Sequence, residues 1–305
     1  MTRLIQMSGV IMDHVYWVEA VPLPGQEAVV RRASLAPGGG FNAMVAARRM
    51  GMDVAYGGTL GEGPFATVIE KALAAEGINC LRPPLPGFDQ GCCTVLIDSQ
   101  GERSFIASEG ADGVVTPADL LAVRAETQDW LLISGYALLY PGSRAAMTGW
   151  LAEKPVGTLV FDPCPQIAAI PQDSRDAALA AADWISANRG EATSLTGLAD
   201  PGAAAVALSR RAGGAVVRDG PNGCHLAQGG ERAVHILGHR VTAIDTNGAG
   251  DAHIGAFIAA LARGEPAMRA CTLANIAAAL SITEEGPSTA PSLDRVLAEL
   301  ARAAN

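Results

Sequence analysis

Four short apolar runs, each preceded by a helix-like segment, constrain the fold of this chain most strongly. They are DWLLISG (129–135), GTLVFDP (157–163), DWISAN (183–188) and GAVVRDG (214–220). Strands that are apolar on both faces suit a parallel sheet buried between two layers of helices. Earlier, NAMVAARRMG (42–51) and GPFATVIEKALAAEG (63–77) have helical spacing and end at glycines. The pattern predicts a three-layer α/β fold with a mostly parallel central sheet.

Two segments, 13–39 and 91–113, break this alternation because they are rich in strand-forming residues and contain no convincing helix. The second has a turn signal, DSQGE, between two β-type runs and therefore predicts a hairpin. We expect the two segments to form a small β lid on a single domain that spans 1–305, since a strand-rich insertion of this kind can close a site against water. An oligomerisation flap is the alternative, and the two roles can coexist.

The composition excludes several classes of protein. The 305 residues carry a net charge of −9, which argues against a nucleic-acid partner. The six cysteines form no C-x-x-C pair, so we expect free thiols in a reducing compartment. The N-terminus lacks the features of a signal peptide, and no run is long enough to span a membrane. We therefore expect a cytoplasmic protein with no membrane partner.

The segment DTNGAGDAHIGAF (245–257) is the most specific chemical signal. It lies between a strand-like run, HRVTAI (239–244), and an apolar helix, and its loop contains Gly248, Ala249 and Gly250. Such a loop leaves the N–H groups of the first helical turn free to bind an anion such as phosphate. Asp251 would repel that anion, so we expect it to be a general base toward an attacking hydroxyl. The alternative is an acid that only caps the helix.

Other candidate residues have structural alternatives of comparable weight. Asp13 and Asn42 can hold vicinal hydroxyls, or can be a turn acid and a helix cap. Asn188 and Glu191 share one face if their segment is helical, but they also fit a capping box. We interpret His253 as structural, and no metal-ligand spacing links the other histidines.

Two other nucleotide-binding motifs are excluded. GGGFNA fits G-x-G-x-x-A, but it does not follow an apolar strand, and the acid that this dinucleotide fingerprint requires about 20 residues later is missing. The P-loop motif G-x-x-x-x-G-K-[ST] is absent as well.

DTNGAGD resembles the D-T-x-G-A-G-D signature of the ribokinase-like (PfkB) carbohydrate kinase family, and the resemblance continues over nearly the whole chain in the right order. It implies a ribokinase-like fold with ATP and Mg²⁺ as cofactors. For the substrate it implies that Asp13 holds sugar hydroxyls and that Gly39, Gly40 and Asn42 form the double-glycine motif. On the nucleotide side, the corresponding residues are Asn188, Glu191 (indirectly, through Mg²⁺), Gly220, Gly223 and Asn275.

The chain also departs from the family pattern. Gly40-Phe41 stand where ribokinase has Lys-Gly, and Ser134, Gly135 and Tyr136 stand where ribokinase presents a sugar-binding Glu, so ribose is not specified as the substrate. A monovalent-cation loop, for K⁺, would fall at Asp245, Asn247 and SITEEGPSTA (281–290), where Ala290 replaces a frequent hydroxyl.

These features predict an ATP-dependent kinase that phosphorylates a hydroxyl of a sugar or sugar-like compound. A nucleoside kinase of the same fold and a non-catalytic sugar- or nucleotide-binding sensor are the alternatives. Apolar residues alternate with polar ones along the lid segments, so one lid face needs a cover. We expect a homodimer in which the lids meet through Val29, Val95, Ile97 or Phe105; the alternative is a lid that folds onto its own domain as a monomer.

Overall fold

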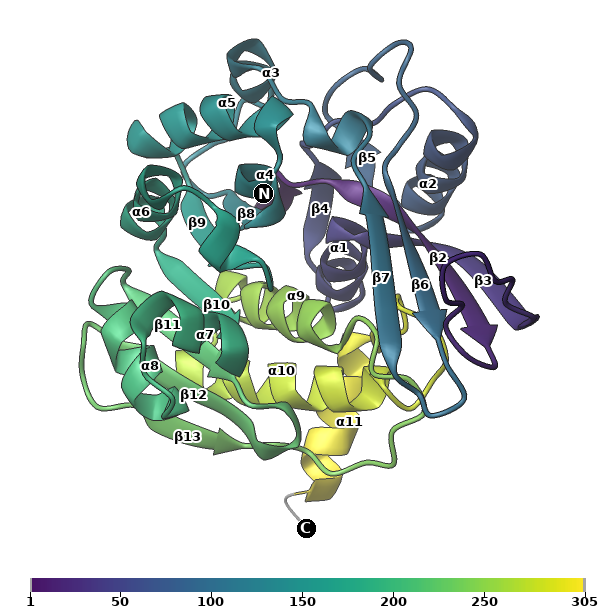
Figure 1. The fold of residues 1–305 in the computed structure, drawn as a ribbon. Coiled ribbons are helices and arrows are strands. Elements are labelled where there is room, and N and C mark those ends of the chain that lie inside the picture. Colours follow the sequence, from purple (N-terminus) through teal and green to yellow (C-terminus); the bar gives the residue numbers. More distant parts are fainter. Residues whose placement is uncertain (1, 304–305) are drawn as a thin grey trace.

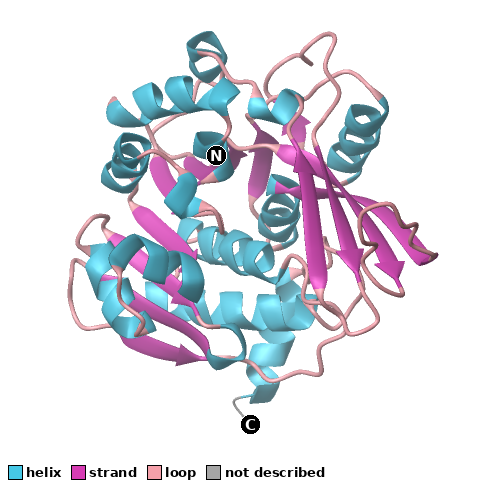
Figure 2. Ribbon diagram, viewed as in Figure 1, coloured by secondary structure: helices cyan, strands magenta, loops and turns pink. Residues whose placement is uncertain are grey.

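The computed structural model describes residues 2–303, and over these residues the chain forms two β-sheets (Figures 1 and 2). The larger sheet has nine strands. In spatial order they are β13 (Val234–Leu237), β12 (Gly223–Gln228), β11 (Gly214–Arg218), β10 (Trp184–Asn188), β9 (Thr158–Asp162), β8 (Trp130–Ser134), β1 (Arg3–Gln6), β4 (Asp53–Tyr56) and β5 (Asn79–Cys80). All pairs from β5 to β11 are parallel, while β12 and β13 are antiparallel additions at one edge.

Helices cover both faces of this large sheet, each with its own apolar core. On one face lie α1 (Gly40–Arg49), α2 (Pro64–Ala75), α9 (Ala249–Ala262), α10 (Ala267–Ser281) and α11 (Leu293–Ala303). On the other face lie α3 (Pro117–Ala122), α4 (Tyr136–Leu139), α5 (Pro141–Ala152), α6 (Gln172–Ala181), α7 (Arg189–Thr196) and α8 (Pro201–Ser209). Three short 3₁₀ turns are η1 (Ala111–Gly113), η2 (Ile167–Ala169) and η3 (Gly220–Asn222). The predicted three-layer α/β class is confirmed.

The second sheet, which we call the small sheet, has the spatial order β3-β2-β6-β7 (Figure 1). Its strands are β2 (Val10–Val18), β3 (Val30–Gly39), β6 (Cys92–Ile97) and β7 (Arg103–Ser108). β6 and β7 pair antiparallel, as the predicted hairpin requires, and β2 pairs parallel with β6. Residues 1, 304 and 305 of the predicted domain lie outside the described residues.

The prediction of a strand at 239–244 is wrong. The last strand, β13, ends at Leu237, and residues 239–244 are irregular. The reason lies at the end of α10: the Ile244 and Asp245 N–H groups both donate to the Ile282 carbonyl, at 2.7 and 3.2 Å, which takes the chain away from the sheet edge. The anion-binding loop is thus anchored to a helix end rather than to a strand.

Two predicted exclusions can be compared with the structure. All six cysteines are free, and three of them are buried. Within residues 2–303, no helix combines the length and the apolar character needed to cross a membrane.

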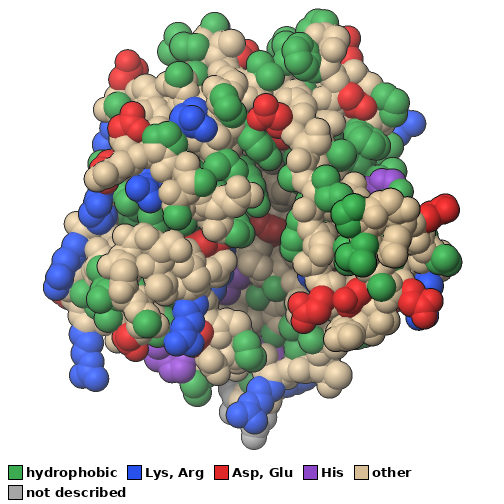
Figure 3. All heavy atoms as spheres, viewed as in Figure 1, with side chains coloured by type: hydrophobic (Ala, Val, Ile, Leu, Met, Phe, Trp, Pro, Cys, Tyr) green, Lys and Arg blue, Asp and Glu red, His purple; other side chains and the backbone are tan. Residues whose placement is uncertain are grey.

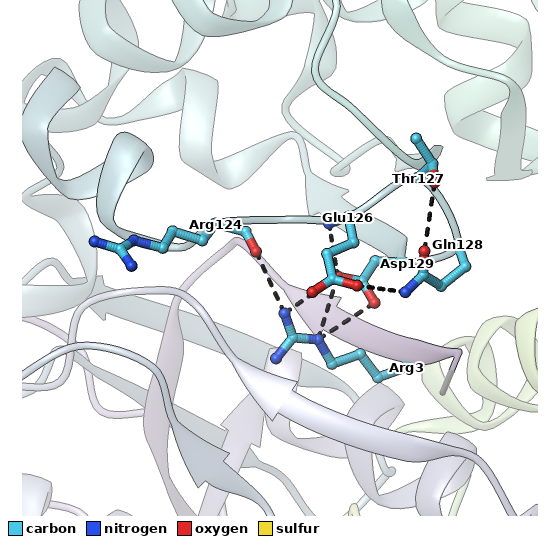
Figure 4. Close-up of polar contacts among 6 residues, drawn as sticks. All are labelled: Arg3, Arg124, Glu126, Thr127, Gln128 and Asp129. Carbon is cyan, nitrogen blue, oxygen red and sulfur yellow. Dashed lines mark hydrogen bonds and ion pairs between the residues drawn. The ribbon is translucent and has the colours of Figure 1, made fainter.

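At the amino ends of the parallel strands, a polar cluster holds β1 beside β8 (Figure 4). Arg3 Nε donates to both carboxylate oxygens of Asp129, at 3.3 and 3.2 Å, and its Nη2 also reaches the Arg124 carbonyl. Asp129 is 1% exposed and additionally accepts the Glu126 N–H at 2.9 Å. Every partner of this carboxylate comes from the protein itself, so the cluster fixes the position of β1.

Candidate active site

A cavity of about 360 Å³ opens at the opposite, carboxyl edge of the large sheet. Its walls come from the ends of β1, β8, β9 and β11, from the start of α9, and from Cys93, Phe105 and Ala107 of the small sheet. Figure 3 shows the surface hollowed between the small sheet and the body of the protein. Ligands in open α/β sheets bind at this edge, because the loops that follow the strands converge there.

The predicted anion-binding loop lies in this cavity, and Gly248, Ala249, Gly250 and Asp251 all line it. Gly248 is the N-cap of α9 and has φ +75°, which a glycine adopts without strain. A Cβ at this position would lie 2.1 Å from the Pro287 carbonyl oxygen, so no larger residue fits. The first turn of α9 thus lines the cavity, where a helix N-terminus favours an anion, and the Ala249 N–H makes only a long hydrogen bond, of 3.4 Å, to the Thr246 carbonyl.

Asp251 lies in the first turn of α9 and is held by a chain of hydrogen bonds. Asn42 Nδ2 donates to Asp251 Oδ2 at 3.1 Å, and Ser288 Oγ donates to Asn42 Oδ1 at 2.8 Å. Burial, and then the nearby Asp162 carboxylate, raise the pKa of Asp251 to about 7, against the Asn42 hydrogen bond and the Arg218 charge. Asn42, predicted to hold substrate, thus orients the predicted base in this structure.

An ion pair beside this loop, between Arg218 and Asp162, was not predicted from the sequence. Arg218, at the end of β11, donates through Nη2 to Asp162 Oδ1 at 2.9 Å, and through Nη1 to the Gly250 carbonyl at 3.3 Å. Asp162 ends β9, and the side chains of the pair are only 13% and 19% exposed. The sequence did contain a signal for this pair: each of two apolar strands, β9 and β11, ends in a charged residue. The carboxyl ends of parallel strands meet at one edge of the sheet, so two such residues can pair there.

Glu191 joins the same cluster. It is 5% exposed, and its Oε2 lies 3.6 Å from Arg218 Nη2. Burial, followed by the Asp162 charge, raises the pKa of Glu191 to about 7. Asn188 and Glu191 also form the capping box of α7, with Asn188 accepting the Glu191 N–H at 2.9 Å and Glu191 accepting the Asn188 N–H at 2.8 Å. The capping box that the sequence also allowed is therefore present, and it orients Glu191 at the cavity wall.

Asp13, Gly39 and Gly40 also line the cavity. Burial raises the pKa of Asp13 to about 6. The adjacent glycines make room for the side chains around them: a Cβ on Gly38 would lie 2.1 Å from Asp13 Oδ2. The glycines from Gly38 to Gly40 thus let the backbone at the end of β3 pack closely against the residues around the cavity.

Four residues predicted for the nucleotide side, Asn188, Gly220, Gly223 and Asn275, are not in the cavity wall. Asn275 is 6% exposed and donates to the carbonyls of Ile236 and Leu237 at 3.2 and 3.1 Å. Its Oδ1 is 3.2 Å from His253 Nε2, and His253 is buried. In this structure Asn275 and His253 fix β13 against α9 and α10.

Asp245 lies outside the main cavity, in a second one of about 250 Å³ beneath the small sheet. Its carboxylate accepts Arg103 Nη2 from β7 at 3.2 Å, as well as the N–H groups of Asn247 and Gly286. The Ser288 and Ala290 carbonyls accept Arg49 Nη1 at 3.0 and 2.9 Å. Three of the groups expected to hold a monovalent cation, the Asp245 carboxylate and the Ser288 and Ala290 carbonyls, are thus already bonded to arginines, so in this arrangement these three do not fit that ion.

The four residues predicted to contact a second subunit occupy different surroundings. Val95, Ile97 and Phe105 line the second cavity and face the loops at 245–247 and 285–287. Val95 is 7% exposed, whereas Phe105 is 65% exposed and Val29, between β2 and β3, is 73% exposed.

Comparison with known proteins identifies the family. A model of the pfkB family of carbohydrate kinases matches residues 1–294. The chain is 27% identical over 298 residues to the uncharacterized sugar kinase YegV of Escherichia coli K12, covering 95% of this chain and 92% of that protein. It is 28% identical over 295 residues to ribokinase of Haemophilus influenzae, covering 93% of each.

A similar solved structure is that of Arabidopsis thaliana ribokinase complexed with ribose and ATP. It matches with a TM-score of 0.80 at 21% identity and covers 98% of both chains, which confirms the predicted ribokinase-like fold. With the family model spanning nearly the whole chain, this chain belongs to the pfkB family of carbohydrate kinases, which are phosphotransferases with an alcohol group as acceptor.

Proposed function

We propose that the chain transfers the γ-phosphoryl group of ATP to a hydroxyl of a sugar or sugar-like acceptor, with Asp251 as the general base. The observation that carries this proposal is the position of Asp251: it lies in the first turn of a helix whose N-terminus faces the cavity, and burial raises its pKa to about 7. A base of that pKa is half ionised near neutral pH and can accept a proton from a hydroxyl.

In the proposed reaction, an acceptor hydroxyl lies within hydrogen-bond distance of Asp251 and attacks the terminal phosphorus in line with the leaving oxygen of ADP. Its proton passes to the Asp251 carboxylate, whose orientation Asn42 and Ser288 maintain. The N–H groups of Gly248, Ala249 and Gly250 stabilise the negative charge on the phosphoryl oxygens. Arg218 adds a positive charge behind this loop through its bond to the Gly250 carbonyl.

Mg²⁺ would neutralise charge on the phosphates of ATP. Glu191 fits an indirect role toward this ion, because its carboxylate is in the cavity wall while the described residues offer no group of three or more acidic, histidine or cysteine side chains that could hold a metal by themselves. The phosphates would then supply most of the ligands, with Glu191 acting through water. Gly220 and Gly223 are proposed to contact the nucleotide through their backbone, and Asn188 and Asn275 to shape that side of the site.

The small sheet is proposed to act as a lid. Phe105 and Ala107 of β7 line the same cavity as Asp251, so the small sheet forms part of the wall around the reacting groups. Two ion pairs tie it to the loops on the other side: Arg103 to Asp245, and Arg32 to Glu285 at 2.7 Å. Opening of the lid would break both pairs and admit substrate, and closure would exclude water.

We also propose that the chain is a homodimer through the small sheet. Val95, Ile97 and Phe105 face the protomer's own loops, so the contacts fall to Val29 and to the opposite face, where Leu35 and Ile106 are 48% and 63% exposed. Light scattering at micromolar concentration should give twice the mass of the chain, and Ile106→Asp should give a monomer. A fully active monomer in the unchanged protein would contradict the dimer.

The function is tested by measuring ADP release from Mg-ATP over a panel of pentoses, hexoses, keto-deoxy acids and nucleosides. We expect one or more sugars to stimulate ADP release well above the acceptor-free rate. If nucleosides alone do so, the chain is a nucleoside kinase. If nucleotide binds and no member stimulates ADP release, the sensor alternative is favoured over the kinase.

A further inference from the structure

We propose that Gln6 and Asp112 bind hydroxyl groups of the acceptor, and that the acceptor is an uncharged polyhydroxy compound rather than a sugar acid or a sugar phosphate. This inference rests on the proposed kinase function and specifies its substrate class. It comes from two buried polar groups in the cavity wall that have no partner within the protein.

Gln6 is the last residue of β1, which lies between β8 and β4 and therefore ends at the middle of the carboxyl edge. The side chain lines the cavity and the residue is 2% exposed, yet its Oε1 accepts no hydrogen bond. A buried acceptor without a hydrogen-bond partner destabilises the fold, so it is seldom found without a function. Gly40 packs against this amide, since a Cβ there would lie 2.2 Å from Gln6 Nε2.

Asp112, in η1, is the second such group. Its Oδ1 accepts the N–H groups of Gly91 and Gly110 at 2.7 and 3.1 Å, which fixes the carboxyl in place. Its Oδ2 is buried and has no partner, although the residue lines the cavity. Asp112 packs against Gly9, where a Cβ would lie 2.7 Å from Asp112 Cβ.

The two groups flank one junction of the backbone. The Gly40 N–H donates to the Gly9 carbonyl at 3.0 Å, and each of these glycines packs against one of the two side chains. Gln6 and Asp112 thus reach the cavity from either side of this hydrogen bond. Neighbouring hydroxyls of one small molecule can therefore meet both of them.

The charges of the cavity wall indicate which class of acceptor binds there. The cavity is lined by the carboxyl groups of Asp13, Asp112, Asp162, Glu191 and Asp251. Among the described residues that line it, Arg218 is the one cationic side chain, and it is already paired with Asp162. The anion-binding loop in the same cavity is already assigned to the transferred phosphoryl group of ATP. A carboxylate or phosphate on the acceptor would therefore meet like charges without a counter-ion of its own, which is strongly unfavourable at a buried site.

A hydroxyl group suits both unpartnered atoms. It donates to the Gln6 Oε1, and it can either donate to or accept from Asp112, because a hydroxyl has one proton and two lone pairs. Burial raises the pKa of the Asp112 carboxyl, so this versatility matters at the pH where the group titrates. A neutral polyol can therefore form hydrogen bonds with both Gln6 Oε1 and Asp112 Oδ2, in either protonation state of Asp112.

The test is equilibrium binding by calorimetry, in the presence of ADP, so that it does not depend on phosphoryl transfer. The probes are neutral pentoses and hexoses, their aldonic and 2-keto-3-deoxy acids, and their monophosphates. We expect binding of a neutral member and none of its acid or phosphate. Tighter binding of an acid or a phosphate, or no binding of any neutral member, would overturn the proposal.

Two variants assign the role to the named residues. Gln6→Leu and Asp112→Ala should each weaken binding of the neutral sugar by about 10-fold, the loss expected for one hydrogen bond. In turnover they should raise KM more than they lower kcat. Gln172→Leu, at an exposed position at the start of α6, is the matched control and should bind normally. Unchanged sugar affinity in a folded Gln6→Leu or Asp112→Ala protein would refute the assignment.

The outcomes distinguish the proposed kinase function from the proposed class of acceptor. ADP release with acids or phosphates, but not with neutral sugars, would leave the kinase function standing and remove this inference. Binding of neutral sugars that depends on Gln6, without any ADP release, would support the inference and remove the kinase function.

Discussion

The two edges of the large sheet each carry an arginine–aspartate pair, and the two pairs differ in their surroundings. At the amino edge, the Asp129 carboxylate is matched by one guanidinium, that of Arg3, and accepts the backbone N–H of Glu126 (Figure 4). At the carboxyl edge, Arg218 lies among Asp162, Glu191 and Asp251, so one cation faces three carboxyl groups. Buried ion pairs by themselves therefore do not distinguish a structural cluster from an active site.

The difference lies in the excess of like charge. The first pair balances, whereas at the second, burial and then the nearby Asp162 charge raise the pKa values of both Glu191 and Asp251 to about 7. Such a cluster stores electrostatic repulsion that a bound metal–nucleotide complex and a substrate proton can relieve. The comparison predicts that changes at the amino edge alter stability alone, while changes at the carboxyl edge alter chemistry.

The largest effect is expected for Asp251→Asn. This change keeps the shape and removes the base, so turnover should fall by about 100-fold to 10,000-fold while ADP still binds. Steady-state kinetics and calorimetry on the same protein measure the two quantities. Asp129→Asn, at the opposite edge, serves as the matched control and should keep its turnover in the folded protein. Undiminished turnover in Asp251→Asn would remove the base from the mechanism.

Arg218→Met should reduce both stability and activity. Removal of the cation leaves Asp162 and Glu191 without their counter-charge, at a cost of about 3 kcal/mol in the free energy of unfolding. The Gly250 carbonyl also loses its contact beside the anion-binding loop. Urea denaturation and kinetics should therefore both change. Arg3→Met should lower stability by a smaller amount, because the Arg3 side chain is 30% exposed, and should not change kcat.

The pH dependence should show activity and stability moving in opposite directions. Below about 7 the Asp251 carboxyl is protonated and cannot accept a proton, so kcat/KM should fall about 10-fold per pH unit under acid conditions. The native pKa is raised above its ordinary value of 3.8, so the folded state holds a proton that the unfolded state has already released. This contribution to stability is full below about 4 and is lost as the pH rises through about 7.

Thermal melts and initial rates from pH 4 to pH 9 measure how stability and kcat/KM each depend on pH. In Asp251→Asn, the part of the stability change that comes from this group should disappear. A rate that is independent of pH between 5 and 8 would show that the base titrates elsewhere.

The smallest effect is expected for Arg103→Gln. The side chains of the Arg103–Asp245 pair are 32% and 20% exposed, so the loss of the pair should change stability by only about 0.2–1 kcal/mol. Its removal frees the Asp245 carboxylate, and rates should then respond to added K⁺ more strongly than in the unchanged protein. An equal response in both proteins would mean that Arg103 does not compete with a cation at this loop.

Much of the architecture could be predicted because its cause is local. Strands β8, β9, β10 and β11 are apolar on both faces, and this composition suits a position between two helical layers. DTNGAGD could be placed at a helix start because glycine and the following apolar stripe determine the local backbone. The irregular path of residues 239–244 could not be predicted from local sequence, because it depends on hydrogen bonds to the end of α10.

The candidate site was predictable where single residues carry a chemical signature. Asp13, Asn42 and Asp251 meet in one cavity, although they come from three distant parts of the chain. Asp162 and Arg218 were not found, since their pairing joins strands 56 residues apart and neither residue lies in a recognisable motif. Gln6 and Asp112 were missed for a different reason: the lack of a partner for each is a property of the packed structure alone.

The chain Ser288–Asn42–Asp251 has a consequence for the order in which the enzyme becomes active during synthesis. Ser288 follows α10, and its contact with this group of side chains is the hydrogen bond to Asn42. A nascent chain that has folded its sheet as far as β13 still lacks both Asp251 and the residue that orients Asn42. Full activity would therefore appear only once the segment before α11 has emerged from the ribosome.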